Sequence, residues 1–240
     1  MKFIQDILAD TSHRPFELPD GPWIYYQEWN NALFLHWTIP FDILRKCVPS
    51  DLLIDTFEGN CYISLVAFTM EKTRPKFLPS IDYISNFDGI NLRTYIDHND
   101  KKGVYFLSIG AGKSLSSFIA KTISGLPYEK FNINRTNKTY SSNNIRRDFT
   151  FNAEFEIKQE LDHKTELDKW LTERYCLYLD KDNKIYRYDI HHKEWTLKNV
   201  NIKTLNLSYK IGDVHFADHP PTLSHYSDGV KVIGWRRQKV

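Results

Sequence analysis

Cysteine is scarce in this 240-residue sequence, and the three cysteines show no pairing pattern. Cys47, Cys61 and Cys176 form no CxxC motif, and each lies in an apolar run where a small buried hydrophobe would serve. This spacing excludes a disulfide-rich scaffold and a zinc site built on cysteine pairs. A reducing compartment suits such a chain, so we expect the protein to be cytoplasmic.

An excess of charge of either sign is also missing. Lysine and arginine total 32 against 30 aspartate and glutamate residues, which gives a formal net charge of +2, and the charges are interspersed. We therefore expect no nucleic-acid partner. No apolar run is long enough to span a membrane, and Asp6 and Asp10 interrupt the N-terminal apolar face, which argues against a signal peptide and a membrane partner.

No glycine-, serine- or proline-rich linker divides the chain, so residues 1–240 are predicted to form a single domain. What the sequence does contain is aromatic residues, at 15% of the total, in short apolar runs separated by turn formers. This pattern favours a mainly β (α+β) fold. Because closure removes unpaired strand edges, we predict a closed or curled antiparallel β-barrel with a few outer helices.

Two strand patterns in the N-terminal half support this fold class. One strand is predicted to begin before Gln27 and to resume at Ala32. Residues 52–57 and 60–68 are predicted to form a hairpin of neighbouring strands around Glu58-Gly59, since the glycine can adopt a positive φ. Helical spacing of apolar residues predicts short helices at the N-terminus and at 43–48, 114–124 and 162–174.

Motifs that would carry familiar chemistry fail on spacing. The GAGKS sequence at 110–114 lacks the first glycine of a phosphate loop, because Leu107 stands in its place. His215 and His219 lie in a proline-broken segment instead of on one helix face, and no G-x-S-x-G elbow singles out a nucleophilic serine. We therefore expect no metal ion and no cofactor.

Charged residues inside apolar, strand-like runs are more informative. Arg93 in INLRTYI, and Glu173 with Arg174 in WLTERYCLY, stand where one strand face should be buried, and a buried ion needs a partner or a ligand. One interpretation is a buried salt bridge between Arg93 and Glu173 that orders the barrel. The other is an anion or carboxylate site built on the planar guanidinium of Arg93.

Several segments resemble a known family. The stretch FDILRKCVPSDLLIDTFEGNCYISLVAF resembles a region of the acetoacetate decarboxylase-like superfamily, in which a short helix, a proline, an aliphatic-acidic pair and a strand recur in this order. The whole chain more closely resembles the uncharacterised bacterial YqjF-type family of that superfamily, through LFLHW at 33–37, VPSDLLIDTFEG at 48–59, NLRTYI at 91–96, SGLPY at 124–128, WLTERYCLY at 170–178 and YSDGVKVIGW at 226–235. The resemblance implies a cone-shaped antiparallel barrel around a ligand-sized cavity, with helices packed outside.

The chemistry of the decarboxylases transfers less readily. They use a Schiff-base lysine in a Lys-Lys pair, where the neighbouring charge and a dry pocket depress its pKa. Just before SGLPY, where this pair is expected, the chain has one lysine, Lys121, and the decarboxylases' pocket arginine and glutamate have no convincing counterparts. Lys121 is the best amine candidate and Lys113 the next, beside the simpler interpretation of Lys121 as a solvated helix lysine.

These observations predict a barrel cavity that binds a small anionic or carbonyl-bearing organic ligand. Arg93 is the expected anion-binding fork, and Tyr95 and Tyr128 are expected hydroxyl donors. His36 and Glu173 are candidate proton carriers. One alternative is a lyase or decarboxylase that forms a Schiff base with a small oxo-acid at Lys121, and another is a non-catalytic regulatory or dimerisation module. Catalysis and association into a homo-oligomer both stay open.

Overall fold

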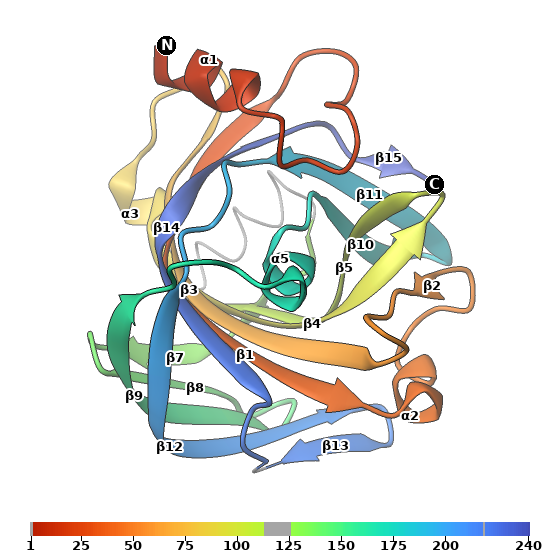
Figure 1. The fold of residues 1–240 in the computed structure, drawn as a ribbon, viewed down its shortest axis with the longest axis vertical. Coiled ribbons are helices and arrows are strands. Elements are labelled where there is room, and N and C mark those ends of the chain that lie inside the picture. The colour runs from red at the N-terminus through yellow and green to blue at the C-terminus, as the bar shows by residue number, and fades with distance from the viewer. Residues whose placement is uncertain (1, 113–125, 218) are drawn as a thin grey trace.

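The computed structural model describes residues 2–112, 126–217 and 219–240, which form a 15-stranded sheet and a few helices (Figure 1). Part of the sheet curls into a ring, because β11 pairs with β14 as well as with β10. The order around the ring is β11 (Lys184–His191), β10 (Cys176–Lys181), β5 (Lys101–Ala111), β4 (Phe87–His98), β3 (Cys61–Pro75), β1 (Tyr25–Ile39) and β14 (Leu223–Gly234). The predicted mainly β fold with a curled, mostly antiparallel sheet is confirmed, although β10 and β5 run parallel.

Beyond β14 the sheet continues and folds back over the outer face of the ring (Figure 1). The continuing strands are β12 (Lys198–Ile211), β9 (Phe149–Glu160), β8 (Thr139–Asn144) and β7 (Asn132–Arg135). Tyr140 on β8 donates a hydrogen bond to the Gly89 carbonyl on β4 at 2.9 Å, which ties this layer to the ring. Short strands pair along the edges: β2 (Leu53–Ile54) with β4, β6 (Glu129–Lys130) with β5, β13 (Val214–Ala217) with β12, and β15 (Gln238–Lys239) with β11.

The central strands β1, β3 and β4 are buried on both faces. Successive strand residues point to opposite sides, so Leu33 and Leu35 enter the core beneath β8 and β9, whereas Ala32 and Phe34 point into the ring. The two faces therefore belong to two separate apolar cores. Burial on both sides explains why LFLHW reads as a continuous apolar run instead of an alternating one.

A β-bulge keeps one face of β1 directed into the ring. The register with β3 shifts between Asn30 and Leu33, and Asn31 has a φ of 53°. Opposite the bulge, Gly229 has a φ of 141°, and a Cβ atom there would collide with the Asn30 side chain. The interruption predicted before Ala32 is thus a bulge inside one strand. It changes which residues face inward, from odd-numbered positions before it to even-numbered positions after it.

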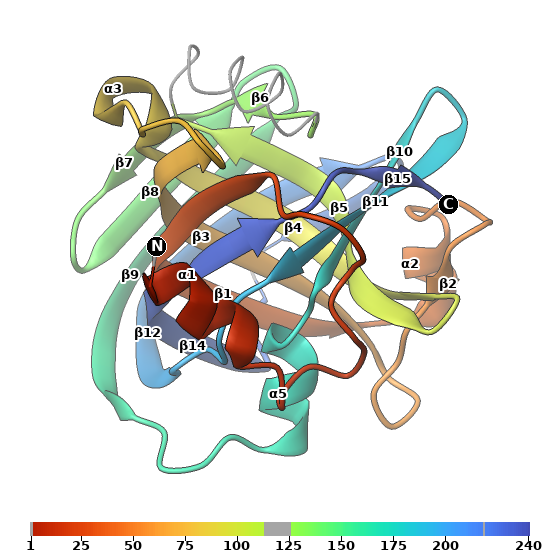
Figure 2. The same cartoon turned by 90° about the horizontal axis from the view of Figure 1, so that it is seen from above.

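The helices are short and lie at the periphery or at one end of the ring. Helix α1 (Lys2–Ala9) packs Ile4 and Ile7 against Tyr26 and Ile233 on the outside of the ring (Figure 2). Helix α5 (Glu166–Thr172) lies within the outline of the ring in Figure 1. The remaining described helices are α2 (Phe41–Arg45) and α3 (Asp82–Ser85). The helix predicted at 114–124 falls outside the described residues.

Helix α5 is shorter than the predicted span of 162–174. A capping box starts it, in which Thr165 and Asp168 exchange side-chain and backbone hydrogen bonds. Its C-cap is Glu173, so this residue terminates a helix and does not belong to a strand. None of the helices in the described part of the chain is long and apolar enough to cross a bilayer.

The predicted hairpin at 52–68 is wrong in its pairing. Glu58 and Gly59 both have positive φ, and an isolated bridge joins Phe57 to Asn60, so the turn itself is present. However, β2 pairs with β4 and not with β3. The reason is that β1 and β4 already occupy both edges of β3, which leaves no free edge for the preceding segment.

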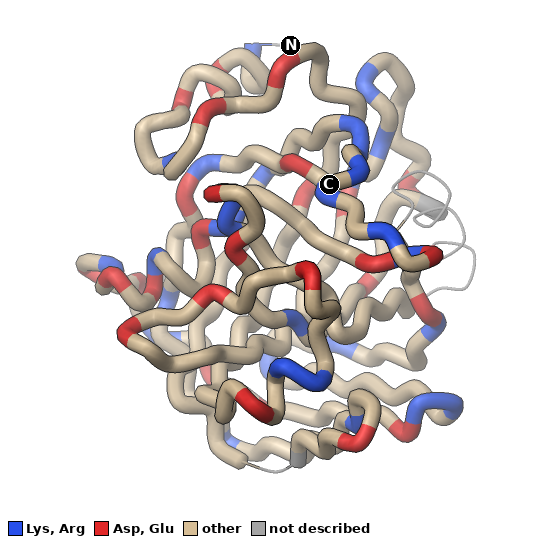
Figure 3. The backbone as a smooth tube through the Cα atoms, turned by 90° about the vertical axis from the view of Figure 1, so that its right-hand side faces the viewer, with Lys and Arg blue, Asp and Glu red and all other residues tan. Residues whose placement is uncertain are grey.

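Charged residues are mixed along the backbone. Figure 3 shows positively and negatively charged residues interspersed along the backbone on the face that it views. This mixing agrees with the near balance of charge in the sequence. The charges that matter for a site are therefore the few that are buried.

The parallel seam between β5 and β10 gives the first prediction. Gly103 lies beside Cys176 at this seam, where a Cβ atom would collide with the Cys176 carbonyl, and Leu177 pairs with Val104. Gly103→Ala should lower the free energy of unfolding by roughly 1–3 kcal/mol, because the strands would have to move apart. Urea unfolding measures this. Gly112→Ala is the control, since its Cβ would meet neighbours only at 3.4 Å or more; equal losses in both variants would contradict the close approach.

Candidate functional site: an aromatic cavity with an unpaired arginine

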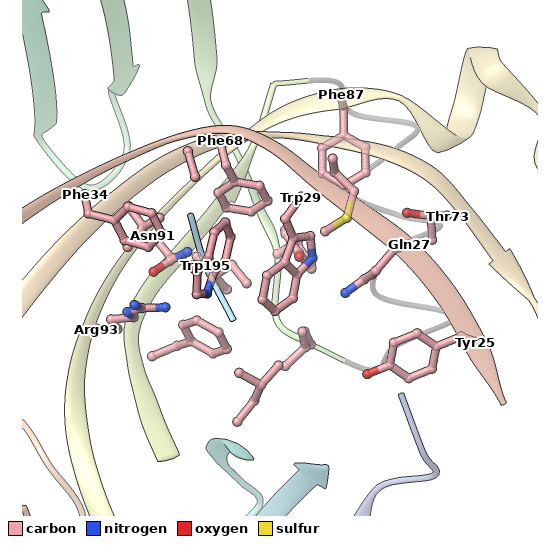
Figure 4. Close-up of a pocket in the computed structure, with 18 residues that line it drawn as sticks. Tyr25, Gln27, Trp29, Phe34, Phe68, Thr73, Phe87, Asn91, Arg93 and Trp195 are labelled. Atoms are coloured by element: carbon pink, nitrogen blue, oxygen red, sulfur yellow. The ribbon is translucent and has the colours of Figure 1, made fainter. Parts of the chain in front are cut away.

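The ring encloses a cavity of about 60 Å³ (Figure 4). Its wall is mostly aromatic and comes from β1, β3, β4, β5 and β10, together with the loop that carries Trp195, and includes Trp29, Phe34, Phe68, Phe87, Phe106 and Trp195. One water needs roughly 10–15 Å³ on this measure, so the free space accommodates about four to six water-sized groups. A small metabolite fits without movement of the wall, whereas a larger one requires side chains to move.

Among the lining residues that the structure describes, only Arg93 carries a formal charge. Its side chain comes from β4, it is 8% exposed, and it lies over the Phe34 ring at 5.8 Å. One guanidinium nitrogen donates a long hydrogen bond of 3.4 Å to the Leu171 carbonyl, and Nε has no partner in the described structure. No carboxylate in the described ranges forms a salt bridge with it. The charge is therefore buried without a counter-ion in contact.

Burial lowers the pKa of the Arg93 guanidinium, and the neighbouring Tyr95 hydroxyl opposes this shift. Arginine nevertheless keeps its proton in proteins, so the group stays a cation. A buried cation without a partner is costly in free energy, and a bound anion would remove much of that cost. The arrangement can accept a planar anion such as a carboxylate through two parallel N–H donors.

Uncharged polar groups in the same wall also lack partners. Trp29 Nε1, Thr73 Oγ1 and Asn91 Oδ1 are buried and make no hydrogen bond within the described part of the chain. Figure 4 places Asn91 beside Arg93 at one end of the cavity and Thr73 and Gln27 at the other. Trp29 lies between the two ends. Native proteins leave few buried polar atoms unsatisfied, and four of the 11 such side-chain atoms in the described structure, with Arg93 Nε included, belong to residues of this wall. Together they offer donors and acceptors to a second polar group on a ligand.

Behind the wall lies a chain of buried hydrogen bonds. Tyr95 OH lies 2.5 Å from Ser64 Oγ, which lies 2.6 Å from His36 Nδ1. His36 Nε2 lies 3.4 Å from His225 Nδ1, and His225 Nε2 lies 2.9 Å from Asp168 Oδ1. All five residues are at most 5% exposed. The chain runs from the residue beside Arg93 to the carboxylate that caps α5.

Both histidines of this chain favour the neutral state. Burial lowers the pKa of His36 well below its usual range, and the charges of His225 and Arg93 would lower it further. Burial also lowers the pKa of His225, while Asp168 acts in the opposite direction. At neutral pH in the free protein, Arg93 and Asp168 are therefore the charged groups at the two ends of this chain.

The predicted site residues are only partly brought together. Arg93 and Tyr128 line the cavity, and burial raises the pKa of the Tyr128 hydroxyl. Tyr95 and His36 lie in the hydrogen-bonded chain behind the wall. Lys121 lies outside the described residues. The roles proposed for these residues remain predictions.

The predicted salt bridge between Arg93 and Glu173 is wrong. Glu173 accepts hydrogen bonds from Lys164 at 2.9 Å and from the Tyr175 hydroxyl at 2.7 Å. It also accepts one from the Trp195 backbone N–H at 3.0 Å. Glu173 is the C-cap of α5, inside the predicted helix span of 162–174, and these three contacts occupy its carboxylate.

The adjacent Arg174 forms the buried pair instead, at 2.7 Å from Asp55. Arg93 and Arg174 are buried, as the sequence predicted, but the predicted partner of Arg93 is wrong.

Several residues of the site were not identified from the sequence. Asn91 was detectable, because Asn91, Arg93 and Tyr95 alternate along one strand and must share a face. His225 and Asp168 were not, since their contact with each other and with His36 joins β1, α5 and β14 across long stretches of sequence. Trp195 stands in a loop whose position follows only from ring closure.

The fold identifies the class of protein first. A solved structure of acetoacetate decarboxylase matches with a TM-score of 0.59 at 14% identity, over 98% of this chain and 97% of that one. The enduracididine biosynthesis enzyme MppR, with HEPES buffer bound, matches with a TM-score of 0.59 at 10% identity, over 93% of this chain and 89% of that one. At such low identity the match shows the fold alone, and the chain has the acetoacetate decarboxylase-like fold.

Sequence similarity then identifies the family. The model of the DUF2071 family, described as an uncharacterized conserved protein, matches residues 26–231. The uncharacterized protein YqjF of Bacillus subtilis (strain 168) is 36% identical over 230 residues, which cover 92% of this chain and 95% of YqjF. The chain therefore belongs to the DUF2071 family, and the resemblance inferred from its segments is confirmed.

The unpaired cation gives the second prediction. Arg93→Met should raise the free energy of unfolding of the ligand-free protein by about 1–2 kcal/mol, because an apolar side chain of similar length replaces a buried charge. Urea unfolding in carboxylate-free buffer measures this. Arg174→Met is the matched control and should lower the same free energy by about 3 kcal/mol, because it removes the buried partner of Asp55 and leaves that carboxylate only the 3.5 Å contact with the more exposed Lys102. A loss in both variants would show that Arg93 serves the fold.

Proposed function

We propose that this protein binds a small organic carboxylate in the ring cavity, with Arg93 as the residue that holds the anion. The observation that carries the proposal is the buried guanidinium of Arg93, which faces the cavity without a carboxylate partner in the described structure. A carboxylate ligand would pair with this charge and remove much of the cost of burying it. Binding alone accounts for the buried charge and the polar groups of the cavity wall.

The rest of the wall supports a ligand with one charged end and a short, weakly polar remainder. Aromatic side chains surround the cavity, and a low-polarity environment strengthens the attraction between a guanidinium and a carboxylate. Asn91 lies two residues from Arg93 on the same strand face and has an unpaired carbonyl oxygen. This oxygen would accept a hydrogen bond from a hydroxyl or amino group next to the carboxylate.

Proteins of the same fold support the size of the proposed ligand. MppR has been solved with pyruvate, in a structure that matches this chain with a TM-score of 0.57 at 10% identity. Pyruvate has the size that a cavity of about 60 Å³ accommodates. The similarity extends to the fold, so the class of ligand is transferred to this chain as part of the proposal.

The third prediction concerns this anion site. Acetate, lactate and pyruvate should each be tested for raising the melting temperature of the wild-type protein, with the corresponding amides for comparison. We expect at least one carboxylate to stabilise the protein and its amide to have little effect, because the amide lacks the charge that Arg93 attracts. Isothermal titration then gives the dissociation constant.

The variants make this test specific. Arg93→Met should weaken binding by about tenfold or more, in line with the loss of a charge-assisted pair. Arg146→Met removes the same charge from an exposed position and should bind as the wild type does. Equal binding of the carboxylate by the wild type and Arg93→Met would contradict the proposal.

Schiff-base catalysis is the second candidate function. The positions of two lining residues, one on each side of the interval 113–125, favour testing it. Ile109 and Leu126, which stand before and after the undescribed residues 113–125, both line the cavity. Lys113 and Lys121 belong to that interval. The described lining residues include no lysine, so an imine would have to form on a residue outside them.

The fourth prediction separates these two functions. Treatment with pyruvate and borohydride, followed by mass spectrometry, should leave the chain unmodified if the carboxylate is held by Arg93 alone. A reduced adduct at Lys121 that is absent from Lys121→Arg would instead establish the imine chemistry. Lys164→Arg is the control, since Lys164 already pairs with Glu173.

A further inference from the structure

We propose that the carboxylate enters the cavity together with one proton, which the His36–His225 pair holds behind the wall. This inference rests on the proposed function, because it concerns the ligand held by Arg93. The protein would then bind both parts of the neutral acid: the carboxylate anion at Arg93 and the proton at the His36–His225 pair. The direction of the buried hydrogen bonds and the balance of buried charge both favour a proton at this pair.

The hydrogen-bonded chain has a direction that Asp168 sets. Asp168 Oδ2 accepts the Thr165 backbone N–H at 2.8 Å, and Oδ1 lies 2.9 Å from His225 Nε2. An ionised carboxylate only accepts, so His225 Nε2 carries a hydrogen and, in a neutral ring, Nδ1 is the acceptor. His36 Nε2 must then donate to His225, which leaves His36 Nδ1 to accept from the Ser64 hydroxyl.

The same logic shows where an added proton can reside. If His225 gains a proton on Nδ1, His36 Nε2 becomes the acceptor and His36 Nδ1 carries the hydrogen toward Ser64. Each contact is kept and only the hydrogens move. Protonated His225 then forms an ion pair with Asp168 at 2.9 Å. The chain can therefore store one proton without moving heavy atoms.

Buried charge explains why a ligand would bring that proton. In the free protein, Arg93 and Asp168 carry opposite charges at the two ends of the chain, and the histidines between them are neutral. A carboxylate at Arg93 adds a negative charge to this interior. A proton on the His36–His225 pair restores the balance. The anion also offsets the positive charge of Arg93, which disfavours a proton on His36.

The other charged groups around this pair already have partners. Arg174, which lies 4.9 Å from the centre of the Tyr95 ring, pairs with Asp55. On the far end of α5, Glu173 pairs with Lys164. The groups that face the pair from the elements packed against it are thus Arg93 and Tyr95 of β4, Ser64 of β3 and Asp168 of α5. Among these four residues, Arg93 and Asp168 carry charge.

The sign of the pH dependence follows from this scheme. The complex holds more protons than the free protein, so affinity for the carboxylate should rise as pH falls. For uptake of one proton, the dissociation constant changes by up to about tenfold per pH unit. A site that uses only Arg93 would show no such slope between about pH 8 and pH 6, because neither arginine nor a small carboxylate titrates there.

The experiment is calorimetric titration of wild-type protein with acetate, lactate and pyruvate, each in two buffers of different ionisation enthalpy near pH 7. The difference in heat between buffers counts the protons taken up. We expect uptake of about 0.5–1 proton per bound carboxylate, with affinity rising toward lower pH. Uptake near zero in a wild-type protein that binds a carboxylate would overturn this inference and leave the proposed function standing.

Variants show where the proton resides. His225→Gln should bind the carboxylate with uptake near zero and a flat pH profile, because it removes the ring that gains the proton. His36→Gln should reduce the uptake, because it removes the ring nitrogen that accepts from protonated His225. His215→Gln is the control, since His215 is exposed and bonds only to Ser208 among the described residues, and it should match the wild type. Unchanged uptake in both pair variants would overturn the assignment. Absence of carboxylate binding in the wild type would overturn the proposed function and this inference together.

Discussion

The buried charge of Arg93 is the constraint around which the interior of the ring is organised. A guanidinium that is 8% exposed and has no carboxylate in contact, within the described structure, is unfavourable in a hydrophobic core. The aromatic wall excludes water from it and so increases both the cost of leaving the charge unpaired and the benefit of an anion. Asn91 lies beside this side chain, and the hydrogen-bonded chain behind the wall begins at the neighbouring Tyr95.

The ring can hold such a group because its central strands carry two cores. Outward-facing residues of β1, β3 and β4 pack beneath β8 and β9, and this second core stabilises strands whose inward face is not fully apolar. The bulge at Asn31 keeps β1 contributing to the cavity wall from Tyr25 to Phe34. The outer core thus supports the fold, while the inner face is free to carry Arg93, Asn91, Ser64 and His36.

The sequence predicted the features that depend on neighbouring residues. Alternation and aromatic content indicated a curled sheet, and an arginine within INLRTYI indicated a buried cation near a cavity. Features that depend on distant contacts were missed. Glu173 was paired with Arg93 because its contacts with Lys164 and the Trp195 backbone depend on how α5 lies in the ring. The pairing predicted at 52–68 was wrong because β1 and β4 occupy both edges of β3. The contact between His225 and Asp168 required the closed ring.

The comparisons give the family and the fold of this chain. The chain shares 36% identity with YqjF of Bacillus subtilis and the fold of acetoacetate decarboxylase. The decarboxylase-like fold supplies the enclosed space, and this chain supplies its own polar groups within it. Arg93 and the chain from Tyr95 to Asp168 therefore provide a basis for comparing members of the family by charge and hydrogen bonding.

Nuclear magnetic resonance of the arginine side chains tests the central claim most directly. The Nε–H signal of Arg93 can be assigned as the one that disappears in a variant without this arginine. Because this N–H is buried and unpaired, the account predicts a distinct signal that shifts in a saturable way when a small carboxylate binds. A signal that stays unchanged while the protein binds carboxylate would contradict the account.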